Sequence, residues 1–333
     1  MVKINLSKSL KYLMFFGLGI VIFYFVYRGQ DPSRIWEGVK EFSFGWVLLS
    51  LVFSFISLLV RALRWRMMIQ PLGYSPSILN TFLAILIMYL ANFAFPRLGE
   101  ISRCGVLTKY EKVPFTPQIG TVVTERIIDF IILIFIFLVV ILAQFGLITG
   151  FIDNNRLKLG FDSPLLHSSL FWFGLLAFII LMGAVFYLYR DRIRSHAWTK
   201  KISELLKKFL EGLLSVRKLK KPGLFIFYSL SIYACYFLMT LSILRGYEPT
   251  REMGAGAAFA LLAMGSIGMI LPVQGGIGTY HFFVIETLLI LGLARPEGQL
   301  VALVLHGSMT IFIIFIGLVA LLALPIVNRK KME

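Results

Sequence analysis

Three short stretches interrupt otherwise apolar sequence with charged residues or glycines: PRLGEISR, TERIID and LPVQGGIG. Ionisable residues inside a bilayer are costly, so each one in an apolar stretch is a candidate functional residue. Arginine presents a planar fork of donors that suits bidentate contacts with phosphate. Backbone N–H groups freed at a helix break also favour an anion. These residue types and positions therefore predict a binding site for an anionic group.

The candidate substrate-binding residues come from both halves of the chain. They are Arg97, Gly99, Glu100, Arg103, Glu125, Arg126 and Asp129 in the first half, and Gly275, Gly276, Gly278, His281 and Glu286 in the second. The arginines would bind phosphate, the carboxylates would orient them or exchange protons, and the glycines would let a headgroup approach the backbone.

The spacing within TERIID places its charges on neighbouring positions of one helix. Glu125 and Asp129 lie four residues apart on one face, and Arg126 precedes Asp129 by three, so we expect pairing within the helix and with the PRLGEISR break. The alternative is that these charges pair only among themselves and hold the break in place. His306 stands alone on an apolar helix, which favours a hydrogen-bonded packing role.

Enzymatic and metal-binding motifs are missing from the sequence. The cysteines Cys104 and Cys235 have neither CxxC nor Cys/His spacing, so no disulfide framework, metal site or cofactor is predicted. The sequence contains no GxSxG, HExxH or P-loop pattern, and the segments between apolar runs are too short for a soluble catalytic domain. We expect a protein that is not an enzyme. The enzymatic alternative is an intramembrane transferase or phosphatase that uses His281 and Glu286.

The elements that must position these residues are membrane helices. The 333 residues are 58% hydrophobic with a mean hydropathy of +0.84, and several charge-free apolar runs are long enough to cross a bilayer. The runs lack the alternation of barrel strands, so the fold class predicted is an all-α polytopic membrane protein. A net charge of +16 could indicate a nucleic-acid partner, but the charge lies in the segments between apolar runs, so none is expected.

The distribution of Lys and Arg predicts the topology. Residues 61–77, residues 190–221 and the C-terminal tail carry an excess of Lys and Arg and are expected to be cytoplasmic, as is the N-terminus, whose first apolar run is a retained anchor. The remaining loops are balanced in charge and belong outside. The predicted spans are 12–27, 44–60, 118–148, 165–189, 222–244 and 299–325. This assignment leaves residues 78–108 and 254–294 as two re-entrant helical hairpins that enter from opposite sides.

The same order of span, span, hairpin and span occurs twice, with the second copy inverted, which is typical of transporters. Residues 1–149 form the first membrane repeat, residues 150–189 begin the second, and residues 222–328 complete it. Between them, residues 190–221 form a cytoplasmic basic amphipathic linker. The alternative is eight to ten ordinary spans with an irregular charge bias.

At the same three stretches the chain resembles the transmembrane region of lysylphosphatidylglycerol synthases, the flippase-like integral membrane family of the multiple peptide resistance factors. That family pairs Pro-x-x-Gly-Glu and Glu-Arg-x-x-Asp with a later Pro-Gly-Gly-x-Gly-x-x-Glu. The residues that match the first two motifs are Pro96, Gly99, Glu100, Glu125, Arg126 and Asp129. In the third motif Gln274 replaces the proline and His281 replaces the glutamate.

The resemblance implies that the protein moves a lipid with a charged headgroup between the leaflets of the cell membrane. Bifunctional family members carry a cytoplasmic aminoacyltransferase domain after the membrane region, whereas this sequence ends at Glu333, so synthase activity is not implied. Two alternatives are a secondary transporter of a small anion and a non-transporting partner of a lipid or polysaccharide enzyme. A second copy of the chain and a separate lipid-modifying enzyme are the protein partners left open.

Overall fold

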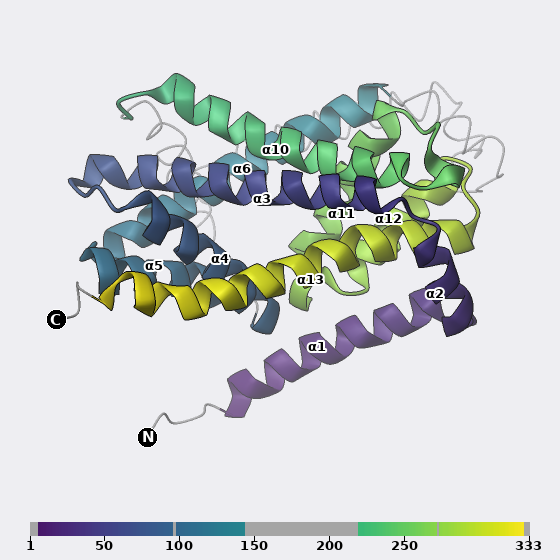
Figure 1. Cartoon of the computed structure of the whole chain (residues 1–333), viewed down its shortest axis with the longest axis horizontal. Coiled ribbons are helices and arrows are strands. Elements are labelled where there is room, and N and C mark those ends of the chain that lie inside the picture. The colour runs from purple at the N-terminus through teal and green to yellow at the C-terminus, as the bar shows by residue number, and fades with distance from the viewer. Residues whose placement is uncertain (1–5, 96–97, 144–218, 272, 330–333) are drawn as a thin grey trace, which may run out of the picture. The chain divides into compact units, whose positions relative to one another are not determined.

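The computed structural model describes residues 6–95, 98–143, 219–271 and 273–329 (Figure 1). These residues form ten α-helices: α1 (Leu6–Tyr27), α2 (Pro32–Lys40), α3 (Phe44–Ile69), α4 (Ile78–Ala94), α5 (Leu98–Glu111), α6 (Phe115–Ala143), α10 (Pro222–Arg245), α11 (Ala255–Ile270), α12 (Thr279–Ile290) and α13 (Arg295–Val327). Short 3-10 turns, η1 (Gln70–Leu72), η3 (Glu248–Thr250) and η4 (Gln274–Gly276), join some of them. These ranges contain no β-strand, so the all-α fold class is confirmed for them.

Three of the described helices are long and apolar enough to cross a membrane. They are α3 with its following turn (Phe44–Leu72), α10 and α13, and shorter apolar helices cover Gly17–Tyr27, Ile78–Phe93 and Ala255–Ile270. This composition is that of an integral membrane protein. The predicted span 165–189 and nearly all of the predicted linker 190–221 lie outside the described residues.

Helix α3 extends beyond the end predicted for its span. The charges of residues 61–77 suggested a cytoplasmic loop after residue 60, but the helix continues to Ile69. Arg61 and Arg64 are 4% and 0% exposed. Carboxylates of α6 pair with these two arginines inside the protein, and the cytoplasmic location of residues 61–77 stays a prediction.

The first predicted break separates two helices that pack against each other. Helix α4 ends at Ala94 and α5 begins at Leu98. Close to the break, the Gly99 N–H donates to Asn92 Oδ1 at 2.8 Å. At the far end of the pair, Ser77 Oγ donates to Glu111 Oε1 at 2.9 Å. The start of α4 and the end of α5 therefore lie together, and the two helices form an antiparallel hairpin.

The second predicted break lies between α11 and α12 and includes the turn η4. Gly275, Gly276 and Gly278 have positive φ angles of 59°, 71° and 83°, a region that favours glycine. Across the break, Thr279 Oγ1 donates to the carbonyl oxygen of Gly268 at 2.8 Å. A Cβ at Gly268 would lie 2.7 Å from the Cα of Tyr280, so the two helices approach too closely there for a larger residue.

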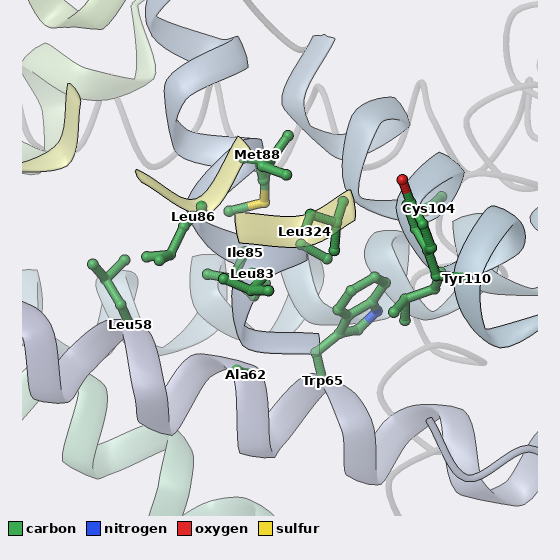
Figure 2. Packing of buried hydrophobic residues seen from close by; sticks show 14 of the residues in the cluster. Leu58, Ala62, Trp65, Leu83, Ile85, Leu86, Met88, Cys104, Tyr110 and Leu324 are labelled. Atoms are coloured by element: carbon green, nitrogen blue, oxygen red, sulfur yellow. The ribbon is translucent and has the colours of Figure 1, made fainter. Parts of the chain in front are cut away.

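Four apolar clusters hold the described helices together, and α13 contributes to the two largest. The first cluster joins α3, α4, α5 and the last turns of α13, and Figure 2 shows side chains such as Trp65, Leu86 and Leu324 converging there. The second joins α10, α11 and α12 with the first half of α13, including Val301 and Leu305. Because lipid is as apolar as these side chains, close packing rather than water exclusion drives such helix association.

Candidate functional site

A buried cluster of charges joins three helices in the first half of the chain. Arg61 and Arg64 come from α3, Arg103 from α5, and Glu125 and Asp129 from α6. The ion pairs are Arg61 Nη1 to Glu125 Oε1 (2.7 Å), Arg61 Nη1 to Asp129 Oδ2 (3.1 Å), Arg64 Nη1 to Asp129 Oδ1 (2.7 Å), Arg64 Nη2 to Glu125 Oε1 (3.2 Å) and Arg103 Nη2 to Glu125 Oε2 (2.9 Å). Four of the five residues are fully buried or nearly so. We call these five residues the ion cluster.

Helical periodicity explains how the ion cluster forms. Glu125 and Asp129 lie one turn apart on one face of α6, and Arg61 and Arg64 lie on one face of α3, so the two pairs meet as two facing rows. On α5, the Arg103 guanidinium carbon lies 4.4 Å from the centre of the Trp65 ring, a cation–π contact that holds the side chain in place.

Polar side chains of α10 complete the surroundings of the ion cluster. Arg61 Nη2 donates to the Tyr236 hydroxyl at 3.1 Å, and Arg64 Nη1 donates to Ser229 Oγ at 3.2 Å. The Tyr233 hydroxyl donates to the backbone carbonyl of Asp129 at 2.8 Å. Helix α10 packs along α3 (Figure 1), so the cluster includes contacts from both halves of the chain.

The ion cluster has one more positive than negative charge. Three guanidinium groups face two carboxylates, which leaves a net charge of +1. Arg61 Nε, Arg64 Nε, and Nε and Nη1 of Arg103 are buried without a hydrogen-bond acceptor in the part of the chain that the structure describes. Buried charges and donors without partners are costly, so this arrangement is suited to receive an anion with acceptor oxygens.

A second pair of charges lies beside the ion cluster and is more exposed. Arg126 Nη2 pairs with Glu100 Oε1, which connects α6 to the first turn of α5. The Arg126 side chain is 49% exposed and that of Glu100 is 19% exposed. Arg126 follows Glu125 directly in the chain, so an exposed cation adjoins the buried ones.

The chain matches one protein family over most of its length. Residues 12–317 match the model of the family described as the Lysylphosphatidylglycerol synthase TM region. The chain belongs to this family. It is also 29% identical over 187 residues to the UPF0104 membrane protein MJ1595 of Methanocaldococcus jannaschii, which covers 55% of this chain and 52% of that relative. The chain thus matches about half the length of this curated relative. No solved structure matches it.

In this member of the lysylphosphatidylglycerol synthase TM family, five of the predicted site residues gather near the first break. Arg103, Glu125 and Asp129 belong to the ion cluster, and Glu100 and Arg126 lie beside it. We expected Arg126 to pair with Asp129 within α6. Instead, Arg126 pairs with Glu100, and Asp129 pairs with the arginines of α3. Arg97 lies outside the described residues.

The predicted glycines are placed where chain segments pass close to each other. A Cβ at Gly99 would overlap the Met88 carbonyl, so this glycine permits the packing of α4 against α5. A Cβ at Gly275 would lie 3.1 Å from the Phe93 side chain of α4. The last turn of α4 therefore lies against the second break.

The second half of the predicted site is divided between two places. His281 is buried in the first turn of α12, and its Nδ1 accepts from the N–H of Gly278 at 3.3 Å. Glu286 lies further along α12 and binds Arg295 Nη2 at 2.7 Å. Each of these two side chains is thus held by a different local partner.

Sequence reasoning missed the arginines and tyrosines that complete the site. Arg61 and Arg64 were assigned to a loop, and Tyr236 and Tyr233 were not considered. The signal for α3 is a row of polar residues at spacings of three and four, namely Ser50, Ser54, Ser57, Arg61 and Arg64, all of which are buried. Such a row on an apolar helix indicates a polar face turned toward the protein interior.

Proposed function

We propose that this protein moves a lipid with an anionic headgroup between the leaflets of the cell membrane. The observation that carries the proposal is the ion cluster, in which three buried arginines face only two carboxylates. The family to which the chain belongs is named for the membrane region of a phospholipid-modifying synthase, which supports a role with membrane lipids.

A phosphate group matches the chemistry of the ion cluster. Phosphodiester oxygens would accept the guanidinium N–H groups of Arg61, Arg64 and Arg103 that have no acceptor, and one negative charge would balance the excess positive charge. Arg126 would make the first contact because its side chain is about half exposed beside the buried arginines. The acyl or prenyl chains would stay in lipid while the headgroup passes.

Alternating access would use the two helical breaks. In our proposal α4–α5 and α11–α12 are re-entrant hairpins that enter from opposite sides of the membrane, within an inverted repeat of about six full spans, and both termini are cytoplasmic. The hydrogen bond between Ser77, at the start of α4, and Glu111, at the end of α5, supports a hairpin whose two ends lie at the same depth in the membrane. The contact of Phe93 with the Gly275 position supports a meeting of the two tips.

The direct test is leaflet exchange in proteoliposomes. We would measure the exchange of headgroup-labelled phosphatidylglycerol, its aminoacyl ester and a polyprenyl phosphate, with wild-type protein and with Arg126→Ala. Removal of a charge-assisted contact worth roughly 1.5–3 kcal/mol should slow exchange by about tenfold or more. Arg126→Lys should lie between the two, since it keeps the charge but loses the fork of donors.

Arg251→Ala is the matched control for this experiment. Arg251 is 51% exposed and pairs with Glu248 in the turn after α10, away from the ion cluster, so its loss should leave exchange unchanged. Absence of protein-dependent exchange for all three lipids would contradict the proposal. Counterflow of a water-soluble anion would instead identify a secondary transporter, and full cellular function of Arg126→Ala would indicate a non-transporting partner.

A further inference from the structure

Two histidines lie side by side at the second helix break, outside the ion cluster. His281 is in the first turn of α12 and His306 is on α13. Their ring centroids are 4.9 Å apart with an angle of 87° between the ring planes. The residues are only 2% and 3% exposed. Both rings are thus fixed in the protein interior.

Hydrogen bonds to the backbone define which ring nitrogen of each histidine carries a proton. The carbonyl oxygen of Gly275 can only accept, so His306 Nε2, at 2.8 Å, must donate to it. The N–H of Gly278 can only donate, so His281 Nδ1 must be the acceptor. His306 Nδ1 therefore keeps a lone pair that can take a proton without loss of the bond to Gly275. His281 cannot take a proton at Nδ1 unless its bond to Gly278 breaks.

The groups around the two rings are aromatic. Tyr280 stacks on His306 with ring centroids 4.9 Å apart. Phe23 and Tyr27 of α1 meet His281 edge-on, at 5.2 and 5.7 Å. The titratable groups that face the pair are thus Tyr27 and Tyr280, and in the described ranges no Asp, Glu, Lys or Arg forms an ion pair or hydrogen bond with either ring. A charged imidazole would have no counter-ion in this arrangement.

An open-sided cavity of about 250 Å³ adjoins both histidines. It is lined by residues of α1, the second break and α13, among them Phe23, Ile277 and Thr310. This cavity is a space beside His306 that water can enter, and water is the partner that a charged His306 lacks.

We propose that His306 Nδ1 is a proton-binding site that controls the second break. The lone pair of Nδ1 takes a proton from water, and the ring becomes positively charged while its Nε2–H bond to Gly275 is kept. The charge is disfavoured among aromatic rings and favoured next to water. Protonation therefore shifts the protein toward an opened form in which the cavity is hydrated and Gly278 separates from α1, on which it packs, while Gly275 stays bonded to His306.

Proton linkage gives the size and the sign of this effect. An imidazole in water takes up a proton near pH 6.5. The closed form, which is the structure described above, offers the charged His306 ring no counter-ion. Because the opened form binds more protons, acid favours opening. If only the opened form is protonated, its population relative to the closed form should rise by on the order of 30-fold between pH 8 and pH 5.

Hydrogen exchange of residues 273–282 in nanodiscs tests the proposal. His306→Gln can still donate to the Gly275 carbonyl but cannot become charged, so we expect wild type and this variant to exchange equally at pH 8. At pH 5 the wild type should exchange faster, by up to about 30-fold. Comparison at the same pH removes the intrinsic pH dependence of exchange. Equal rates at pH 5 would overturn the proposal.

A control variant and a direct measurement complete the test. His281→Asn keeps an acceptor for the Gly278 N–H, so it should retain the acid response of the wild type. Nitrogen NMR of ¹⁵N-histidine in the wild type, which has four histidines, should show His306 Nδ1 become protonated on acidification. If His306→Gln already exchanges faster than the wild type at pH 8, the NMR titration of the wild type tests the proposal instead. A His306 Nδ1 that stays unprotonated at pH 5 would contradict it.

Coupling of this proton to lipid movement rests on the proposed function, whereas the proton-linked opening does not. Neither hydrogen exchange nor NMR requires transport. An acid response without lipid exchange would support the histidine site and contradict the transport function. Lipid exchange without an acid response would support the transport function and contradict the histidine site.

Discussion

At the scale of single residues, the central feature is one carboxylate that forms ion pairs with three arginines. Glu125 is fully buried and accepts from, or pairs with, Arg61, Arg64 and Arg103, which come from two other helices. A buried ion pair adds little to stability compared with an apolar contact, but removal of one partner leaves uncompensated charge. Glu125 thus holds the first hairpin and α3 to α6 and also sets the charge that an incoming anion meets.

We expect Glu125→Gln to destabilise the protein by about 3–5 kcal/mol, because it leaves three buried guanidinium groups with a single carboxylate. The measurement is denaturant unfolding in detergent micelles, followed by circular dichroism. Glu286→Gln is the control: its partly exposed pair with Arg295 should contribute no more than about 1 kcal/mol. Equal losses for the two variants would mean that the ion cluster does not hold these helices together.

At the scale of elements, the two breaks determine how the shorter helices pack. The α4–α5 hairpin closes because Gly99 lets α5 approach the Met88 carbonyl and because Asn92 accepts the Gly99 N–H. Sequence patterns predicted both breaks, since a proline with charges and a run of glycines within apolar sequence are strong local signals. They could not predict the contact between the last turn of α4 and the second break, in which Phe93 lies against Gly275.

Gly99→Ala should destabilise the hairpin by roughly 1–3 kcal/mol, because the added methyl group overlaps Met88 and Asn92 unless the helices separate. Gly105 lies on the same helix with no heavy atom within 4 Å of its added Cβ. Gly105→Ala should therefore stabilise α5 by about 0.5–1 kcal/mol. Thermal unfolding of both variants in the same detergent measures the difference, and a harmless Gly99→Ala would refute close packing at this glycine.

At the scale of the whole molecule, the topology in the membrane follows from how the hairpins enter it. The charge bias of the loops was the main sequence argument, and it included Arg61 and Arg64, which proved to be buried in α3. The proposed topology now rests on Lys109 and Lys112 after the first hairpin, on the balanced segment 295–298 after the second, and on the joined ends of α4 and α5.

We expect single cysteines at Lys109 and Arg295 to be labelled by a membrane-impermeant thiol reagent from opposite faces of the membrane. Both side chains lie at or near the ends of helices and are exposed. The two native cysteines, Cys104 and Cys235, are buried and would be replaced by alanine to remove background. Labelling of both positions from the same face would exclude hairpins of opposite orientation.

The sequence by itself determined that the protein lies in a lipid bilayer, that its fold is helical and where both breaks lie. It also identified five of the charged residues near the first break. These depend on local composition and on the spacing of residues along one helix. Only the tertiary structure decided which charges pair. Arg61 and Glu125 are 64 residues apart, and Arg61 and Tyr236 are 175 apart. Helix periodicity states which residues share a face but not which faces meet, so a buried arginine and a loop arginine look alike until the helices are packed.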